Sequence, residues 1–391
     1  MSEEQFMPVN WTDGMKINKS HFLQQDNAVG SQQVLTASGL LNDCNYGLMP
    51  FADPGSSGFR LHLNADNQQQ VTLRLQQCKA ITRGGYAFQV RDSHGFPENP
   101  LGVIIPDLAV PFHQLKGKTD QFFVVLSVDP YQRIPYGLLD PQELPARLPY
   151  SIPSFQLSLV PADAGYNNMV GMFHLAIGKL KVEDQSVNLD ENYIPPCTAV
   201  NSHTDLIAIH AGIEQFYTRM ESYALQIIQK IHQKKQVNEL AAIVQQLCET
   251  ILILMSSQLA EIKTLSLSQP PVYMVNKVSS LARLFKNTLD YFIGSGKEEL
   301  INYCNEWCSV SQVELESAVT NLSNHQYNHL DVNASVDKVL QFTRTISTLF
   351  GNLSRLDYIG KKKDAGIFVK EKALTHDADE QPVKRKSFLA D

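Results

Sequence analysis

Two cysteines and two histidines stand at spacings that could bind a metal ion. Cys304 and Cys308 are four residues apart, and so are His325 and His329. Because residues four apart share one face of a helix, each pair could supply two ligands of a tetrahedral zinc site. The simpler interpretation is that the cysteines are small buried hydrophobic residues and that the histidines flank a turn. The sequence therefore offers a candidate zinc site and predicts no cofactor.

Motifs of the common catalytic classes do not occur in this sequence. It has no phosphate-binding Gly-x-x-x-x-Gly-Lys-Ser/Thr loop and no Gly-x-Gly-x-x-Gly following a strand. It also has no His-Glu-x-x-His and no Gly-x-Ser-x-Gly. Together, these observations favour a protein that is not an enzyme.

Composition narrows the class of protein further. The chain has 391 residues, of which 43% are hydrophobic, and a net charge of −7. Its length fits two or three domains, and its negative charge argues against a nucleic-acid partner. The densest apolar run, 251–255, is far too short to span a bilayer, which needs about 20 residues. The N-terminus has no apolar signal core, and six irregularly spaced cysteines do not form a disulfide pattern. We therefore expect a reduced, cytoplasmic protein without direct membrane insertion.

A change in composition near residue 200 predicts separate domains. Most of the 19 prolines and many short alternating runs precede it, whereas long helical patterns follow it. A strand-rich block followed by a helix-rich block is typical of an α+β multidomain protein. We expect an N-terminal β-sandwich domain over 1–197, a helical bundle or stalk over 198–356, and a short, basic, flexible tail over 357–391.

The pattern of the first block predicts an extended segment over 1–30, followed by a series of strands. Gly84-Gly85 lies between two alternating runs and predicts a hairpin. A proline-rich stretch over 129–153 predicts a loop, and Pro195-Pro196 predicts a hinge. Seven or so strands separated by glycine- and proline-containing turns indicate an antiparallel sandwich. The predicted strands are 59–63, 71–75, 79–82, 86–91, 122–128, 155–160 and 172–182.

The second block begins with an apolar stripe in a 3-4 spacing, sustained for three heptads. Such a stripe is either a seam shared between chains or one buried face of a monomeric bundle, and spacing hardly separates the two. The strictness of the heptads favours the shared seam. Further helical patterns cover 237–254, 274–293, 297–322 and 332–356. The stripe consists of Leu206, Ile209, Ile213, Phe216, Met220, Tyr223 and Ile227.

Four short motifs occur along the chain. The N-terminal motif is Trp11-x-Asp13-Gly14-Met15 followed by His21-Phe22-Leu23-Gln24-Gln25-Asp26. The next three are Tyr46-Gly47-Leu48, Tyr193-Ile194-Pro195-Pro196 and Tyr327-x-His329-x-Asp331. Together they resemble, in order, motifs of the TssK family, a baseplate component of bacterial type VI secretion systems. In that family the second motif enters the first strand, the third closes the N-terminal domain, and the fourth precedes the last bundle helix.

The resemblance implies a fold and a function. It implies a sandwich similar to the shoulder domain of phage receptor-binding proteins, then a helical bundle, then a small head. It also implies a homotrimer without catalytic activity. Such a trimer attaches to the baseplate wedge proteins TssF and TssG and docks on the envelope-anchored TssJ–TssL–TssM complex at the inner face of the cytoplasmic membrane. We expect the wedge contact to involve Trp11, Asp13, Gly14, Met15, His21 and Phe22.

The C-terminal region departs from the family pattern. About 35 residues follow Leu356, whereas the family's head needs on the order of a hundred. The head is therefore expected to be reduced or missing. The short tail, with basic runs at Lys361–Lys363 and Lys384–Lys386, or a replacement for the envelope complex, would then provide the membrane-side contact.

Two other functions fit parts of the same sequence. A phage-tail-like receptor-binding or adhesin protein would also combine a sandwich with a trimeric stalk, and neighbouring genes would distinguish it. A zinc-dependent enzyme would require the Cys/His quartet to bind metal, which a metal assay would decide.

Overall fold

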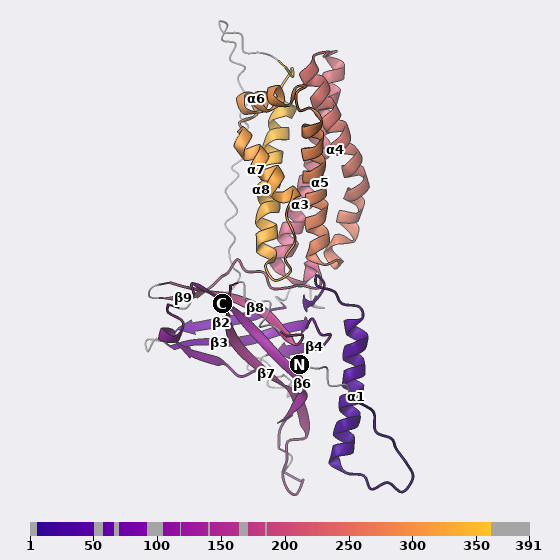
Figure 1. Ribbon diagram of the computed structural model, residues 1–391, viewed down its shortest axis with the longest axis vertical. Helices are drawn as coiled ribbons and strands as arrows, with labels where there is room; N and C mark the ends of the chain where they lie inside the picture. The colour runs from indigo at the N-terminus through magenta and orange to yellow at the C-terminus, as the bar shows by residue number, and fades with distance from the viewer. Residues whose placement is uncertain are drawn as a thin grey trace.

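The molecule has a sheet-rich end and a helical end. Strands form two antiparallel sheets, and a bundle of helices stands on them (Figure 1). One further helix, α1 (Lys19–Ser38), lies beside the sheets and extends away from the bundle. The fold is α+β, with the strands preceding the long helices along the chain. The computed structural model describes residues 6–50, 58–65, 70–91, 105–117, 119–139, 141–163, 171–183 and 186–360.

The first sheet is built around one long strand, β3 (Gln70–Ile81). Val71, Leu73 and Leu75 are buried, while the side chains between them are more exposed. This alternation is the pattern of a strand with one face on a core. β3 pairs antiparallel with each of the other strands of the sheet. These are β1 (Gly47–Leu48), β2 (Arg60–Ala65), β4 (Ala87–Arg91) and β5 (Leu108–Pro111).

The second sheet has the strand order β7-β6-β8-β9. Its pairing is interrupted between Asp129 and Arg133, where the Asp129 carboxylate accepts hydrogen bonds from two backbone N–H groups at 3.0 Å. Beyond this bulge, the first two strands continue as a two-stranded ribbon that points away from the bundle (Figure 1). The strands are β6 (Gln121–Tyr136), β7 (Tyr150–Pro161), β8 (His174–Val182) and β9 (Val187–Leu189).

The two sheets pack against each other through apolar side chains. Phe88 of β4 meets Phe155 of β7 edge to face, with ring centroids 5.7 Å apart. At Gly178 of β8, a Cβ atom would come within 2.6 Å of Leu61 Cδ2 on β2. The sheets therefore approach closely and share one apolar core, as stacked antiparallel sheets do.

The strand predictions are largely confirmed, with two differences. The hairpin at Gly84-Gly85 joins β3 to β4, and the Thr82 N–H donates to the Tyr86 carbonyl at 2.9 Å. The predicted strands 71–75 and 79–82 are one continuous strand. The sequence did not predict β1, β5 and β9, because strands of two to four residues are too short to show alternation.

Two predictions for the first block are wrong. The extended segment expected over 1–30 is helical from Lys19, because the Asn18 side chain caps the N–H groups of Ser20 and His21. The loop expected over 129–153 is partly strand, since β6 and β7 extend into it from both sides. Prolines are compatible with a two-stranded ribbon because its outer edge needs no ladder hydrogen bonds.

The helical end is formed by α3 to α8, with two short 3₁₀ turns. Pro271 takes the first position of α5, where a missing N–H costs nothing. The predicted helix 297–322 is broken in two at Ser309, which adopts a left-handed conformation. The elements are η3 (Val200–Ser202), α3 (Thr204–Gln233), α4 (Glu239–Thr264), η4 (Ser266–Ser268), α5 (Pro271–Tyr291), α6 (Lys297–Cys308), α7 (Gln312–Ser323) and α8 (Val332–Arg355).

The predicted contact between chains through the apolar stripe of α3 is wrong, because the stripe residues are buried within the single chain. Six of the seven are at most 7% exposed, and Tyr223 is partly buried. Phe216 meets Phe342 of α8 edge to face at 6.4 Å, and the Tyr223 ring faces Gly351 of the same helix. The stripe therefore packs against the chain's own helices. The heptad spacing could not reveal this, since a buried bundle face has the same period. The residues are Leu206, Ile209, Ile213, Phe216, Met220, Tyr223 and Ile227.

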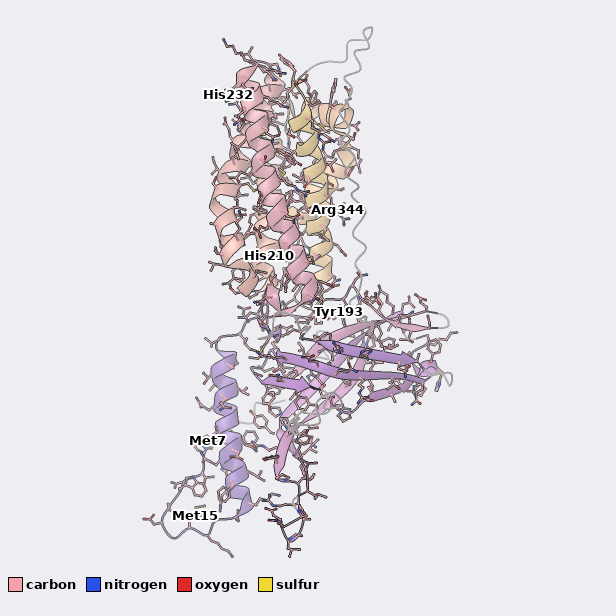
Figure 2. The ribbon with its side chains drawn as sticks, turned by 180° about the vertical axis from the view of Figure 1, so that it is seen from behind. Met7, Met15, Tyr193, His210, His232 and Arg344 are labelled. Atoms are coloured by element: carbon pink, nitrogen blue, oxygen red, sulfur yellow. The ribbon has the colours of Figure 1, made fainter. Side chains whose placement is uncertain are left out.

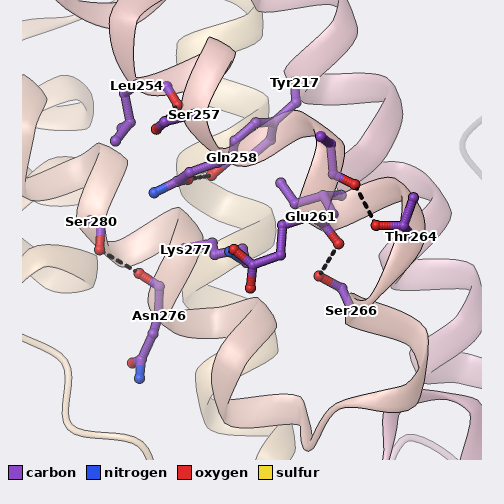
Figure 3. A network of polar contacts seen from close by, with 12 residues as sticks. Tyr217, Leu254, Ser257, Gln258, Glu261, Thr264, Ser266, Asn276, Lys277 and Ser280 are labelled. Carbon is purple, nitrogen blue, oxygen red and sulfur yellow. Dashed lines mark hydrogen bonds and ion pairs between the residues drawn. The ribbon is translucent and has the colours of Figure 1, made fainter.

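Polar contacts also hold α3, α4 and α5 together within one chain (Figure 3). The hydroxyl of Tyr217, which is fully buried, donates to Gln258 Oε1 at 2.9 Å. Lys277 Nζ lies 2.6 Å from Glu261 Oε2, and the lysine side chain is only 13% exposed. Because a buried hydroxyl or ammonium needs a partner, these contacts fix how the three helices align.

By length and composition, α4 is apolar enough to cross a membrane. However, 44% of its most apolar window is buried inside the bundle, between neighbouring helices of the same chain. A core helix of a globular protein passes the same test, and α4 packs against α3 and α5 within the bundle.

We predict that Ile213→Asp combined with Met220→Asp unfolds the bundle instead of separating folded subunits. Each carboxylate would be buried without a partner, which costs about 3 kcal/mol or more per site. Circular dichroism during heating should show a large loss of melting temperature. The matched control is Ile207→Asp with Leu225→Asp on the same helix, where the side chains are 42% and 45% exposed. A buried-site variant that melts like the control would contradict the assignment.

Candidate functional site

The four residues of the candidate zinc site are not brought together. Cys308 lies beside the C-terminal part of α8, because Asn352 Nδ2 donates to its carbonyl at 2.8 Å. His325 lies beside the start of α8, where it contacts Ser335 Oγ at 2.7 Å. Ser335 and Asn352 are 17 residues apart on one helix, or about 25 Å. This arrangement argues against the candidate zinc site.

Each pair has other partners in the structure. Cys304 and Cys308 are buried, and the hydrogen bond between them, together with burial, raises the pKa of the Cys304 thiol. A thiol held in this form is a poor metal ligand. Within the described ranges, no group of three or more His, Cys, Asp or Glu side chains is arranged to hold a metal ion.

The junction between the sheets and the bundle is built on a close approach of two backbones. Gly47 has φ +109°, and a Cβ atom there would collide with the carbonyl of Pro196. The next residue, Leu48, donates its N–H to that carbonyl at 2.7 Å and accepts the Thr198 N–H at 2.8 Å. Glycine is needed at position 47 because other residues disfavour this conformation and would not fit the space.

His329 joins the bundle to the same junction. Its Nε2 lies 2.8 Å from the Tyr46 carbonyl, and the two rings meet edge to face at 4.8 Å. A carbonyl can only accept, so Nε2 carries the proton and Nδ1 accepts from the Tyr327 hydroxyl at 2.9 Å. Burial lowers the pKa of His329 to about 4. The neutral ring therefore acts as a fixed bridge and is not a free acid or base at neutral pH.

The segment around Tyr193 completes the junction (Figure 2). The Tyr193 hydroxyl donates to the Leu330 carbonyl at 3.2 Å, and the Ile194 N–H donates to Asn333 Oδ1 at 2.7 Å. Three of the four motifs that carry the family resemblance thus meet at one place, although 283 residues separate Tyr46 from His329. Their role in this chain is to fix the sheets to the bundle.

The fourth motif lies elsewhere, on an N-terminal arm formed by residues 6–38. The arm descends from the sheets, and Met15 marks its far end (Figure 2). Asp13 and Gly14 form a turn, and the Met15 N–H closes it on the Thr12 carbonyl at 3.2 Å. The Trp11 ring lies 6.2 Å from the rings of both His21 and Phe22. The predicted wedge-contact residues are therefore brought together at the far part of this arm.

The predicted wedge-contact residues differ in their structural roles and in their exposure. His21 belongs to the cap of α1, since its Nδ1 accepts the Asn18 N–H at 3.3 Å. Trp11 and Phe22 remain 45% and 57% exposed. Trp11 is therefore not part of the core formed by the two sheets. An exposed Trp next to an exposed Phe is typical of a protein-binding surface.

The helix of the arm is poorly covered by the rest of the chain. Ala28 is its one buried residue, although the helix has 20 residues. Its exposed apolar residues lie on several sides of the helix, among polar residues. The surface of the arm is therefore suited to being covered by another protein. The exposed apolar residues of the arm are Met7, Trp11, Ile17, Phe22, Leu23, Val29 and Leu35.

Specific contacts nevertheless hold the arm in place. Arg133 Nη1 on the β6–β7 ribbon lies 3.3 Å from Asp26 Oδ2, and the Phe6 ring lies 4.4 Å from the Tyr131 ring. At Gly85, a Cβ atom would come within 2.7 Å of the Val34 carbonyl, so the end of α1 sits tightly on the β3–β4 turn. Farther down, a groove of about 640 Å³ separates α1 from the ribbon.

A second exposed apolar element projects beside the arm. This hairpin tip comprises residues 134–139 and 141–150, at the end of the β6–β7 ribbon (Figure 1). Leu144 is 98% exposed and Leu138 is 75% exposed. The hairpin tip was not predicted, because its proline-rich sequence is also typical of an irregular loop. The signal was present as leucines spaced between the prolines. The exposed apolar residues of the tip are Ile134, Leu138, Leu139, Leu144, Leu148 and Tyr150.

The arm and the hairpin tip together form what we call the docking surface. It contains exposed Trp, Phe, Met and Leu side chains, with few charges among them. Apolar area of this kind stabilises association with another protein at roughly 25 cal/mol per Å² buried. Exposed apolar side chains therefore define this surface.

We predict that Gly47→Ala destabilises the protein by about 3 kcal/mol or more. Alanine disfavours φ +109°, and its methyl group would collide with Pro196. Chemical denaturation would measure the loss. The control is Gly212→Ala in α3, where a Cβ atom meets nothing within 4 Å and alanine favours the helix. Equal stability of the two variants would contradict the proposed role of the junction.

We also predict that the contribution of His329 to stability depends on pH. Its pKa is about 4 in the folded protein and 6.5 ordinarily, so the folded state binds its proton less readily. The stabilisation is complete above pH 6.5 and is lost as the pH falls from 6.5 through 4. The loss is up to about 3 kcal/mol. Urea unfolding of the wild type and of His329→Gln should differ less at pH 4.5 than at pH 7.5. A constant difference would contradict this.

No family model and no curated protein matches the chain. Solved structures similar to this one include components of type VI secretion systems. A crystal structure of TssK has 14% identity and a TM-score of 0.48, with 88% of this chain and 69% of that chain covered. TssK from the type VI secretion system of EAEC, bound to a nanobody, has 10% identity and a TM-score of 0.45, with 84% and 99% covered. The TssK–TssF–TssG baseplate subcomplex has 11% identity and a TM-score of 0.45, with 87% and 99% covered.

Proposed function

We propose that this chain is a structural component of a type VI secretion baseplate. The observation that carries the proposal is how the four TssK-like motifs are placed. Three of them form the junction, through Gly47, Pro196 and His329, and the fourth places Trp11 on an exposed arm. Three motifs fix the sheets to the bundle, and the fourth lies on an exposed surface. This combination is what we expect of a protein that connects two partners. The role is mechanical and needs no catalytic group.

The proposed domain organisation follows the sequence boundaries. Residues 1–197 would act as a sandwich-type shell domain and residues 198–356 as a bundle that extends from it. Contacts between the described parts support this division, because the sheet region and the bundle meet through the narrow set of bonds at the junction. Residues 361–391 of the predicted tail lie outside the described residues.

We propose that the docking surface binds the baseplate wedge, formed by TssF and TssG. Trp11 and Phe22 would bury apolar area in the contact, while Asp13 and Gly14 shape the turn and His21 caps the helix. Met15 lies at the far end of the arm (Figure 2). The exposed leucines of the hairpin tip would enlarge the contact on the other side of the groove.

We propose that the chain acts as a homotrimer on the cytoplasmic side of the membrane. Self-association cannot use the buried stripe of α3, so it would use outward-facing residues of the bundle. Ile253 of α4 is 74% exposed, and it lies on the outer face of the helix with the strongest apolar character. A trimer multiplies each docking contact by three, which raises the overall strength of attachment. The opposite end of each chain would face the envelope-anchored complex or its replacement.

The test is capture of a TssF–TssG wedge complex by the purified full chain. We expect Trp11→Ala with Phe22→Ala to weaken capture about tenfold or more, since two aromatic contacts of 1–2 kcal/mol each are lost. Leu138→Ser with Leu144→Ser should weaken it as well. Light scattering on the same samples should report three subunits.

The control for this experiment is Val313→Ala, which changes an exposed apolar residue in the bundle. It should leave capture unchanged. Unaltered capture by both docking-surface variants, at unchanged melting temperatures, would contradict the proposed wedge contact. A monomeric wild type would contradict the proposed trimer.

A further inference from the structure

The end of the bundle that faces away from the sheets holds the last described residues firmly. Ile359 is 3% exposed, its N–H donates to Gln236 Oε1 at 3.0 Å, and its carbonyl accepts from Asn238 Nδ2 at 3.0 Å. Lys230 Nζ donates to the carbonyls of Ser354 and Leu356 at 2.6 and 3.3 Å. The point at which residue 361 begins is therefore fixed beside the α3–α4 loop.

This exit point lies next to α6. The Tyr303 hydroxyl donates to the Tyr358 carbonyl at 3.3 Å, so the chain passes directly over that helix. Glu299 precedes Tyr303 by four residues and Glu306 follows it by three. Residues at these spacings are neighbours on a helix surface. The last described turn of the chain thus lies close to both glutamates.

The outer face of α6 is acidic and has no cationic partner among the described residues. Glu298, Glu299 and Glu306 are all exposed, and the structure gives them no ion pair within its described part. Lys297, the one basic residue of this helix, is occupied by Asp290 at 2.7 Å. The face consequently presents three unpaired carboxylates.

The chain that continues from the exit point has the complementary charge. Thirty-one residues, 361–391, follow Gly360, and they begin with Lys361-Lys362-Lys363. These lysines are three to five residues beyond Tyr358, a reach of about 10–18 Å in extended chain. Glu299 and Glu306 are seven residues apart along α6, or about 10 Å. The first basic run therefore reaches the whole acidic face.

We propose that Lys361–Lys363 dock on the acidic face of α6 in the same chain. Because the run is tethered a few residues from its binding face, its effective concentration there is high, which compensates for weak individual ion pairs. The second run, Lys384–Lys386, has the same charge but is tethered by more than twenty further residues. An acidic protein that binds the first run must displace α6. This inference concerns contacts within one chain and does not depend on the proposed function.

Limited trypsin digestion of the full chain tests the proposal. Docking protects the peptide bonds after Lys361–Lys363, and the bonds at Lys384–Lys386 serve as an internal standard. In Glu298→Gln/Glu299→Gln/Glu306→Gln, cleavage at the first run should become about fivefold faster or more, since three exposed ion pairs are lost. Cleavage at the second run should not change. Raising the salt concentration should accelerate first-run cleavage in the wild type and have less effect in the variant.

The matched control is Glu214→Gln/Glu221→Gln/Glu249→Gln, which makes the same change of net charge on α3 and α4. It should leave the ratio of the two cleavage rates as in the wild type. Equal ratios in the wild type and both variants, at every salt concentration, would overturn the proposal. So would protection of Lys384–Lys386 that the α6 variant abolishes to the same degree, because the contact would then not be specific for the first run.

Discussion

The arrangement of the molecule depends on the contact between Gly47 and Pro196. These two backbones can meet only because position 47 has no side chain and tolerates a positive φ. The contact brings the first strand of the sheet region against the segment that leads into α3. His329 then closes the joint from the other side through the Tyr46 carbonyl. A connection made of short backbone hydrogen bonds and one neutral imidazole is directional, so it sets the angle between the two ends as well as their distance.

The two ends of the chain, held by this joint, present different surfaces. The arm and the hairpin tip extend from the sheets on the side away from the bundle, and both carry exposed apolar side chains (Figure 1). The far end of the bundle instead carries charged groups and the anchored segment around Ile359. An apolar surface at one end and a charged surface at the other are suited to different partners. Load applied between them would pass through the junction and the buried core of the bundle.

Much of the fold could be predicted from local patterns, whereas contacts between distant segments could not. The helix 332–356 was predicted to within a residue of α8 because its apolar periodicity is strong. The stripe that includes Ile213 and Met220 was also identified, but its period is the same for a shared seam and for an internal face. The Cys304 and His325 pairs had plausible spacing, yet about 25 Å of α8 separates their surroundings. The hairpin tip was missed because prolines such as Pro145 masked its leucines. The role of the arm in wedge binding stays a prediction.

The fold leaves most of the arm uncovered by the rest of the chain. A helix of 20 residues is marginal in water when tertiary contacts do not support it, and α1 buries one residue against the sheets. Its capping by Asn18 and its ion pair with Arg133 are worth at most about 1 kcal/mol each. Such contacts orient the helix without burying its apolar sides. Covering Trp11 and Phe22 with a protein partner would add the missing hydrophobic stabilisation, so folding of the arm and binding of that partner would reinforce each other.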